Sequence, residues 1–153
     1  MGDFAIIPSV PLARIAKTTY IHSIATNSNF VEAPIGTISH LIEMIDKQCD
    51  PDDIIIGLNF IRESRGENGD LYNCYLCGSI CSTIDILDHL YLKKHKTKYL
   101  EKLLSDGYHN AINEINSLSI GETAREGLVD QECAEMMGKF GRGKPVIYGI
   151  KSM

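Results

Sequence analysis

The chain has 153 residues, of which 44% are hydrophobic and 23% are charged. Its mean hydropathy of -0.07 is typical of one globular domain or two small ones, which excludes disorder along the whole chain. The formal net charge of -5 argues against a surface that is basic throughout and binds nucleic acid everywhere. The chain has no apolar run of about eighteen residues and no secretory signal pattern at its start, so we expect an intracellular protein with no membrane partner.

Residues 1–50 are expected to form an N-terminal segment with one clear helix. A weakly patterned stretch at residues 12–24 could form a short helix. A stronger helical pattern begins at Thr37, which is placed as an N-terminal cap, and its apolar residues are Ile38, Leu41, Ile42 and Ile45. The pair Asp50-Pro51 is expected to end this helix, because proline disfavours helical backbone in the residue before it.

Residues 51–106 are expected to form a module of two strands and a helix. Alternating apolar residues predict a strand at residues 53–63, whose buried face would carry Ile54, Ile56, Leu58 and Phe60. A loop at 64–69 and a second strand at 71–77 complete a hairpin. A long helix is then expected from a cap at Ser82 to about Leu104. The strand face should pack on four helix residues: Ile84, Leu87, Leu90 and Leu100.

Residues 107–153 are expected to form a C-terminal helical segment. The pattern predicts helices at residues 110–115 and 123–137, a break at 141–143 and a last strand at 145–150. The predicted fold class is therefore α+β, with a hairpin and helix packed between flanking helices.

A cluster of metal-ligating residues lies within the central module. Cys74 and Cys77 are separated by two residues at the end of the expected hairpin, and His89 and His95 follow on the expected helix. Two thiolates and two imidazoles are the ligands of a closed, tetrahedral Zn²⁺ site with a structural role. The odd total of five cysteines also fits a reduced compartment better than a disulfide framework. Cys81 is an alternative ligand, but the histidines already complete the set, and a small buried apolar role is expected for it.

The spacing of the two histidines requires an irregular helix. Positions six apart on an ideal helix differ by about 120° in projection, so their rings cannot face one ion without a change in the helix. We therefore expect the helix to widen or kink between His89 and His95.

These residues resemble the matrin-type zinc finger, a two-cysteine two-histidine unit found in spliceosomal and double-stranded-RNA-binding proteins. The resemblance covers about residues 71–100, and it implies Cys74, Cys77, His89 and His95 as zinc ligands and a nuclear location. The gap of eleven residues before His89 is one shorter than in that family, and Leu92 stands where the family has a small glycine. A weaker similarity, over about residues 54–104, is to poorly characterised animal repeat modules that contain such a finger.

Four lysines of the expected helix are candidate phosphate contacts: Lys93, Lys94, Lys96 and Lys98. Residues 74–105 carry five lysines against three acidic residues, and this is the one net-positive segment of the chain. The pattern favours shape-led, salt-dependent binding of duplex RNA or DNA. The alternative is a protein–protein interaction module in which zinc is purely structural, because the rest of the chain is acidic and this segment contains no arginine for base recognition.

No catalytic constellation is recognisable. The isolated histidines His22, His40 and His109 have no evident acid or nucleophile beside them in sequence, and each is expected to be structural. The glycine-rich stretch at residues 138–145 lacks the Gly-Lys-Ser/Thr ending of a phosphate-binding loop. We expect no enzymatic activity.

Overall fold

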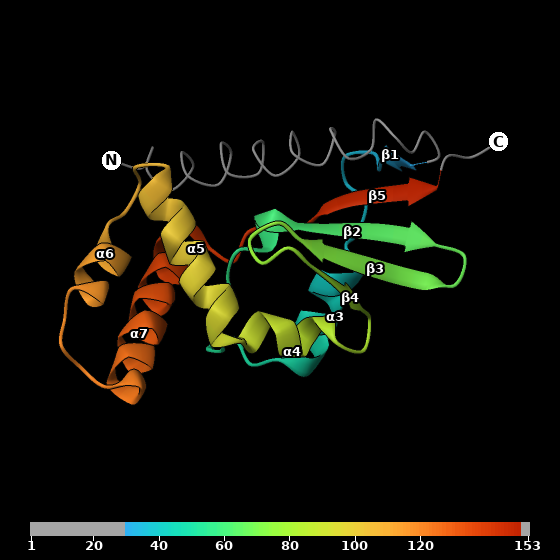
Figure 1. The fold of residues 1–153 in the computed structure, drawn as a ribbon. Helices are drawn as coiled ribbons and strands as arrows, with labels where there is room; N and C mark the ends of the chain where they lie inside the picture. The colour runs from blue at the N-terminus through green and yellow to red at the C-terminus, as the bar shows by residue number, and fades with distance from the viewer. Residues whose placement is uncertain (1–29, 151–153) are drawn as a thin grey trace.

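A computed structural model describes residues 30–150 of the chain as a mixed α+β structure (Figure 1). The helix predicted at residues 12–24 lies outside the described residues. The strands are β1 (Phe30–Glu32), β2 (Ile61–Gly66), β3 (Gly69–Cys74), β4 (Ser79–Ser82) and β5 (Val146–Ile150). The helices are α3 (His40–Gln48), α4 (Ile86–Tyr91), α5 (Lys93–Ser105), α6 (Ala111–Asn116) and α7 (Glu122–Phe140).

The five strands form one sheet in the order β1-β5-β2-β3-β4. β5 pairs parallel with β2 and antiparallel with β1, so the C-terminal strand fills the place between β1 and the central hairpin. β2, β3 and β4 pair as an antiparallel meander in which Tyr72 lies between Glu63 and Cys81. The sheet therefore joins three distant stretches of the chain.

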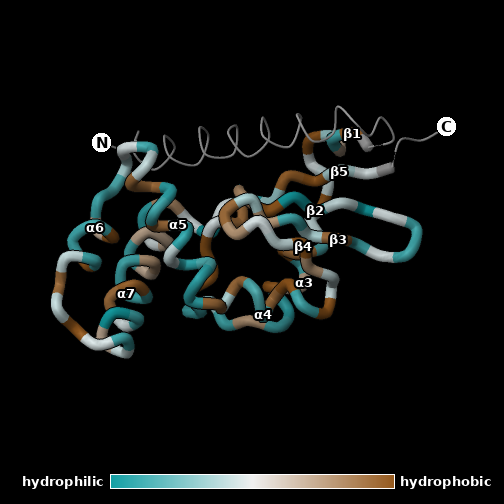
Figure 2. The backbone as a smooth tube through the Cα atoms, in the orientation of Figure 1, coloured by the Kyte–Doolittle hydropathy of each residue, from teal (hydrophilic) through white to brown (hydrophobic). Residues whose placement is uncertain are grey.

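One face of the meander is buried against α3 and α4. Because residues directly opposite each other on paired strands point to the same face, Tyr72 and Cys81 do so, and they join one apolar cluster with Leu41 of α3 and Leu90 of α4. The opposite face is more open, and Leu71 and Ile80 are 51% and 68% exposed there. Figure 2 shows hydrophilic residues at the turn between β2 and β3, where the hairpin projects from the sheet.

The remaining helices form a second apolar cluster beside the sheet (Figure 1). Leu100 and Leu103 of α5 pack with Ile112 of α6 and with Val129 and Cys133 of α7. No helix among residues 30–150 is long and apolar enough to span a membrane.

The strand predicted at residues 53–63 is wrong over most of its length. Residues 58–60 form a short 3-10 helix, preceded by Gly57 in the left-handed conformation with φ +77°, and β2 begins only at Ile61. Ile55, Leu58 and Ile61 belong to the sheet cluster, whereas Ile56 and Phe60 belong to the helical cluster. The stretch therefore passes between the two cores. Its apolar residues alternate because they are buried in different cores, and this alternation led to the wrong prediction of a strand.

The predicted long helix begins later than expected and is interrupted. Ser82 ends β4 and does not cap a helix, and α4 starts after Asp85. Ile84 is 86% exposed, so its predicted packing on the strand face is wrong. The backbone is extended at Leu92, which separates α4 from α5. This break confirms the kink that the histidine spacing requires.

The other elements follow the sequence with small shifts. α3 begins after Ser39 and not after Thr37, and it ends before Asp50-Pro51 as predicted. α6 occupies the predicted position, α7 extends past residue 137 to Phe140, and a strand forms at the C-terminal position predicted for one. The short strands β1 and β4 were not predicted.

The buried carboxylate of Glu63 anchors α3 to the sheet. Its side chain is completely buried on β2. One oxygen accepts hydrogen bonds from the Ser39 hydroxyl at 2.7 Å and the Leu41 amide at 3.0 Å, and the other accepts from the His40 amide at 2.9 Å and from Arg65. A negative charge at a helix N-terminus interacts favourably with the helix dipole, so this carboxylate caps α3 from a neighbouring strand.

Removing this charge should destabilise the fold. Glu63→Gln keeps the shape but replaces one acceptor oxygen with a donor that faces other donors, so we expect the free energy of unfolding to fall by about 2 kcal/mol. Urea denaturation followed by circular dichroism measures this. Glu67→Gln, at an exposed position of the adjacent turn, is the control and should change stability by less than about 0.5 kcal/mol. Equal effects of the two substitutions would contradict the capping role.

Candidate metal centre

The predicted ligands come together from four neighbouring elements. Cys74 ends β3, Cys77 lies in the turn before β4, His89 is on α4 and His95 is on α5. One donor atom from each lies within 4.8 Å of the others, so the group could hold a metal ion. The structure therefore brings together the four residues that the sequence nominated for a metal.

The distances place His95 against both sulfurs. Its Nδ1 lies 3.5 Å from Sγ of Cys74 and 3.8 Å from Sγ of Cys77. The ring of His89 packs edge-on against the ring of His95, with 5.1 Å between the ring centroids. Cys74, His89 and His95 are all buried, and His95 has no exposed surface. The exclusion of these three side chains from solvent suits a closed metal site.

A backbone carbonyl orients His95. Its Nε2 lies 2.7 Å from the carbonyl oxygen of Ile56. Since a carbonyl can only accept a hydrogen bond, Nε2 carries the proton and donates it, which leaves the lone pair of Nδ1 directed at the cysteines. Metal-bound histidines commonly donate their second ring nitrogen to such an acceptor.

His89 supplies a buried nitrogen that no described residue satisfies. Its Nε2 is inaccessible to solvent and has no hydrogen-bond partner within residues 30–150. A buried polar atom without a partner is costly, and coordination of a cation would remove that cost. The unsatisfied nitrogen of His89 therefore supports a metal at this position independently of the ligand spacing in the sequence.

The two thiols differ in their titration. The hydrogen bond that the Cys74 thiol donates to Cys77 holds the pKa of Cys77 well below its usual range. The same bond to Cys77, together with burial, raises the pKa of Cys74. One thiolate therefore forms readily in the cluster, and a bound cation would favour the thiolate form of both cysteines.

Cys81 lies outside the ligand group, although it is close in sequence. Its side chain is buried in the apolar cluster under the sheet, and burial, as the largest effect, raises the pKa of its thiol. This position agrees with the expected apolar role. Cys133 is likewise buried, within the helical cluster.

Three of the four lysines nominated for phosphate contacts form ion pairs with acidic residues of the same chain. Lys93 contacts Glu122 and lies 3.1 Å from Glu126, both at the start of α7. Nζ of Lys96 lies 2.9 Å from Asp130, and only 10% of the Lys96 side chain is exposed. Thus two of the four lysines hold α5 against α7.

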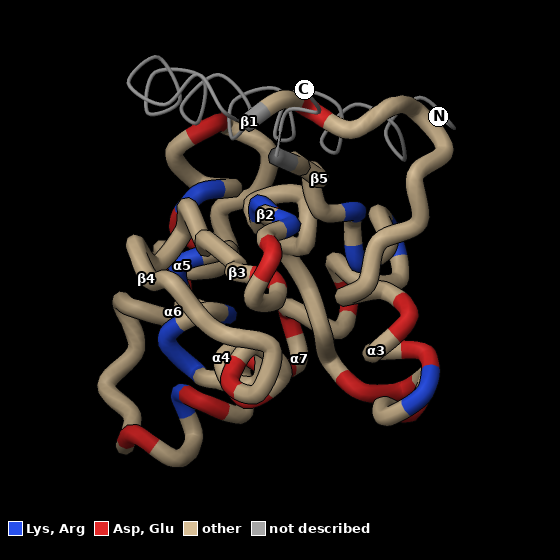
Figure 3. The backbone as a smooth tube through the Cα atoms, turned by 90° about the vertical axis from the view of Figure 1, so that its right-hand side faces the viewer, with Lys and Arg blue, Asp and Glu red and all other residues tan. Residues whose placement is uncertain are grey.

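The other two lysines remain on the surface. Lys98 lies 3.6 Å from Glu101 on the same helix, with 46% of its side chain exposed. Lys94 is exposed and forms no ion pair with any residue in the described part of the chain. Figure 3 shows that acidic residues are prominent along α3 and the chain that follows it, on the sheet side of the molecule.

A second group of possible ligands has other structural roles. His40, Glu63 and Asp70 also place one donor atom each within 4.8 Å. Both oxygens of Glu63 already accept hydrogen bonds at the start of α3, and Nδ1 of His40 lies 2.6 Å from Asp70. We assign no metal to this group.

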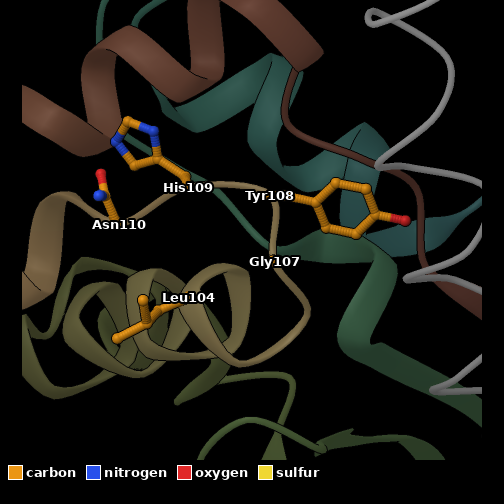
Figure 4. Close-up of a pocket in the computed structure, with 5 residues that line it drawn as sticks. All are labelled: Leu104, Gly107, Tyr108, His109 and Asn110. Atoms are coloured by element: carbon orange, nitrogen blue, oxygen red, sulfur yellow. The ribbon is translucent and has the colours of Figure 1, made fainter.

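A depression after α5 shows no convergence of reactive groups. It is lined by Leu104, Gly107, Tyr108, His109 and Asn110. Figure 4 shows that the Tyr108 ring extends away from His109, and Leu104 lies on another side. His109 instead pairs with Glu132 of α7, at 3.1 Å.

Comparison of the chain with protein-family models, curated proteins and solved structures finds no match. The resemblance to matrin-type fingers therefore stays a prediction, which rests on the ligand spacing. The geometry defines the chain more generally as an α+β protein with a candidate metal site of two cysteines and two histidines.

Substitution of Gly57 tests how closely the backbone must approach the cluster. A Cβ atom there would lie 3.1 Å from both Leu76 and Tyr99 and 3.4 Å from Nε2 of His95. We expect Gly57→Ala to displace the Ile56 carbonyl from His95 and weaken binding of Co²⁺ about tenfold, measured by its thiolate charge-transfer absorption.

Gly107→Ala is the matched control. Gly107 has φ +78°, against +77° for Gly57, but no atom lies within 4 Å of its Cβ position. Both variants should lose about 1–2 kcal/mol of stability through left-handed backbone strain. Only Gly57→Ala should weaken the metal. Equal Co²⁺ affinities in the two variants would show that the close approach at Gly57 is unimportant to the site.

Proposed function

We propose that Cys74, Cys77, His89 and His95 hold a structural zinc ion, and that the chain is a non-catalytic module that binds another protein. The observation that best supports the zinc ion is the four-donor cluster between the two apolar cores, in which three ligands are buried and Cys77 is partly buried. Four protein ligands complete a tetrahedron and leave no open position for a substrate or water. Zinc suits a set of two thiolates and two imidazoles better than the harder divalent cations do.

The finger relationship belongs to the same proposal. The end of β3 and the following turn supply the two sulfurs, and the α4–α5 pair supplies the two imidazoles. β3, β4 and the α4–α5 pair thus follow one another in the order of a ββα finger, with the two cysteines at the turn between the strands. In the full chain the finger would be the centre of a larger domain, because α5 packs on α6 and α7.

The ion pairs of α5 favour a protein partner over nucleic acid. Phosphate binding uses lysines whose charge is free to replace counterions. Lys93 and Lys96 are instead neutralised by three acidic residues of α7: Glu122, Glu126 and Asp130. A nucleic-acid strand would have to compete with these contacts and with the overall negative charge of the chain.

Duplex RNA or DNA remains the second candidate ligand. Lys94 and Lys98 are exposed on α5, and they lie in the one net-positive segment of the sequence. Two lysines can make only a small number of phosphate contacts, so any such binding would be weak and strongly dependent on salt.

Removal of the metal should unfold the junction between the cores. We expect the purified chain to contain about one zinc ion and Cys74→Ser to contain almost none, because the binding free energy of a small site is also folding free energy. Loss of zinc to a strong chelator should lower the Tm by about 10 °C. Elemental analysis and thermal melts followed by circular dichroism measure the two effects.

Cys49→Ala is the control for a thiol outside the cluster. Cys49 is a free cysteine of intermediate exposure at the end of α3. This variant should retain zinc and the same response to the chelator. Melting curves of the natural chain that a chelator leaves unchanged would refute a structural zinc.

Duplex RNA binding separates the two candidate ligands. For a protein-binding module we expect only non-specific affinity for a labelled duplex, with a dissociation constant of about 10⁻⁴ M or weaker at physiological salt. Freeing the paired lysines with the triple change Glu122→Gln, Glu126→Gln and Asp130→Asn should strengthen this binding and steepen its salt dependence. Fluorescence anisotropy across a salt series provides the measurement.

The opposite pattern would favour nucleic acid. If the natural chain bound the duplex tightly, and if Lys94→Gln with Lys98→Gln abolished that binding, the protein-binding role would be replaced by the second candidate. Lys47→Gln with Lys139→Gln is the charge-matched control, because both residues are exposed and lie on other helices.

A further inference from the structure

β4 is a short edge strand of the sheet among the described residues. β4 pairs with β3 on one side and ends the strand order on the other. Its sequence, Ser79 to Ser82, contains no charged residue and no proline, which are common means of blocking an edge. In an antiparallel pair, every second residue of an edge strand directs its N–H and C=O away from the sheet. This edge therefore offers backbone donors and acceptors to another chain, apart from the Ser82 carbonyl, which accepts a hydrogen bond from the Asp85 amide.

Exposed apolar side chains accompany this edge. Leu71 lies opposite Ser82, and Ile80 lies opposite Asn73, so Leu71 and Ile80 are diagonal neighbours on one face of the sheet. They are 51% and 68% exposed, and Ile84, just after β4, is 86% exposed. Large exposed apolar residues gathered at one edge are typical of an interaction surface.

A depression of about 500 Å³ adjoins the same strand. It is lined by residues 66–71 of the β2–β3 hairpin and by residues 82–84. Its apolar walls are Leu71 and Ile84, its charged residues are Glu67 and Asp70, and its lining contains no lysine or arginine. The cavity is thus suited to an apolar side chain with a basic residue beside it.

We propose that β4 binds an extended segment of a partner protein that adds a strand to this edge of the sheet. The segment would place an apolar side chain in the depression between Leu71 and Ile84, and a lysine or arginine near Glu67. Peptides bind in this mode through main-chain hydrogen bonds, and pockets for alternate side chains provide the specificity. This inference rests on the proposed protein-binding function and names the surface and the chemistry of the partner.

Other occupants fit the surface less well. A second copy of this chain would bring the same acidic hairpin, with Glu67 and Asp70, to an edge that already carries both. An anionic membrane or nucleic acid would be repelled by the same two carboxylates. A helix would leave the outward-facing backbone groups of β4 without partners, whereas an extended chain satisfies them.

Titration of the isotope-labelled, zinc-loaded full chain with a synthetic peptide tests the proposal. The probe is a short peptide in which valine and lysine alternate. We expect its NMR signal shifts to concentrate at Ser79–Ser82, Leu71 and Ile84, with slower hydrogen exchange of β4 amides. A peptide with glutamate in place of lysine should bind at least about tenfold more weakly, because Glu67 and Asp70 repel it.

Substitutions on the protein locate the site. Ile84→Lys and Glu67→Lys, both at exposed positions, should each weaken binding of the valine–lysine peptide about tenfold or more without loss of the fold. Ile35→Lys is the matched control. Ile35 is fully exposed and follows β1 at the other end of the sheet, so its substitution should leave the affinity unchanged.

Three outcomes would overturn this site: no shifts with the valine–lysine peptide, shifts confined to another surface, or equal weakening by Ile35→Lys and Ile84→Lys. Shifts on another surface would still support a protein-binding role and would reject only the β4 edge. The protein-binding role itself fails on a different result, which is tight duplex RNA binding through Lys94 and Lys98.

Discussion

The imidazole of His95 makes the contact on which the rest of the structure depends. Nδ1 faces Cys74 and Cys77, and Nε2 binds the carbonyl of Ile56, so one ring joins the sheet, the chain segment before it and α5. The ring is completely buried. The other neutral tautomer, protonated at Nδ1, would lose the hydrogen bond to the Ile56 carbonyl and would point a proton at the sulfurs. The architecture therefore specifies that Nε2 of this histidine carries a proton, together with the position of the ring.

This arrangement lies between two apolar cores, both of which also contact Leu76. Cys74 belongs to the cluster beneath the sheet, with Leu90 of α4, whereas Tyr99 and Leu100 of α5 belong to the cluster of α5, α6 and α7. The extended backbone at Leu92 lets the chain turn from one cluster to the other within a single residue. The break at Leu92 thus accounts for both the histidine spacing and the division of the core. A straight helix could neither direct His89 and His95 at one ion nor pass from one core to the other.

The sequence was sufficient for features that depend on local chemistry and insufficient for those that depend on distant contacts. Ligand spacing nominated the four residues of the cluster and required the break near Leu92, and both are properties of a short stretch of chain. The strand predicted at residues 53–63 failed because Ile56 and Leu58 are buried in different cores, which no local period can distinguish. β1 and β4 are short, and they are held mainly by pairing with longer strands.

The local count of charged residues also failed to predict which lysines are free to bind a ligand. A local count makes residues 74–105 the basic part of the chain, yet Lys93 and Lys96 meet acidic residues of α7 that lie about thirty positions away in sequence. Those pairs use the basic charge to attach α7 to α5, next to the helix break. The depression beside the β2–β3 hairpin has no lysine or arginine in its lining; Asp70 pairs with His40 there, and Glu67 stands beside apolar walls and an open strand edge. A partner with basic and apolar residues is therefore better matched to that edge than a phosphate backbone is to α5.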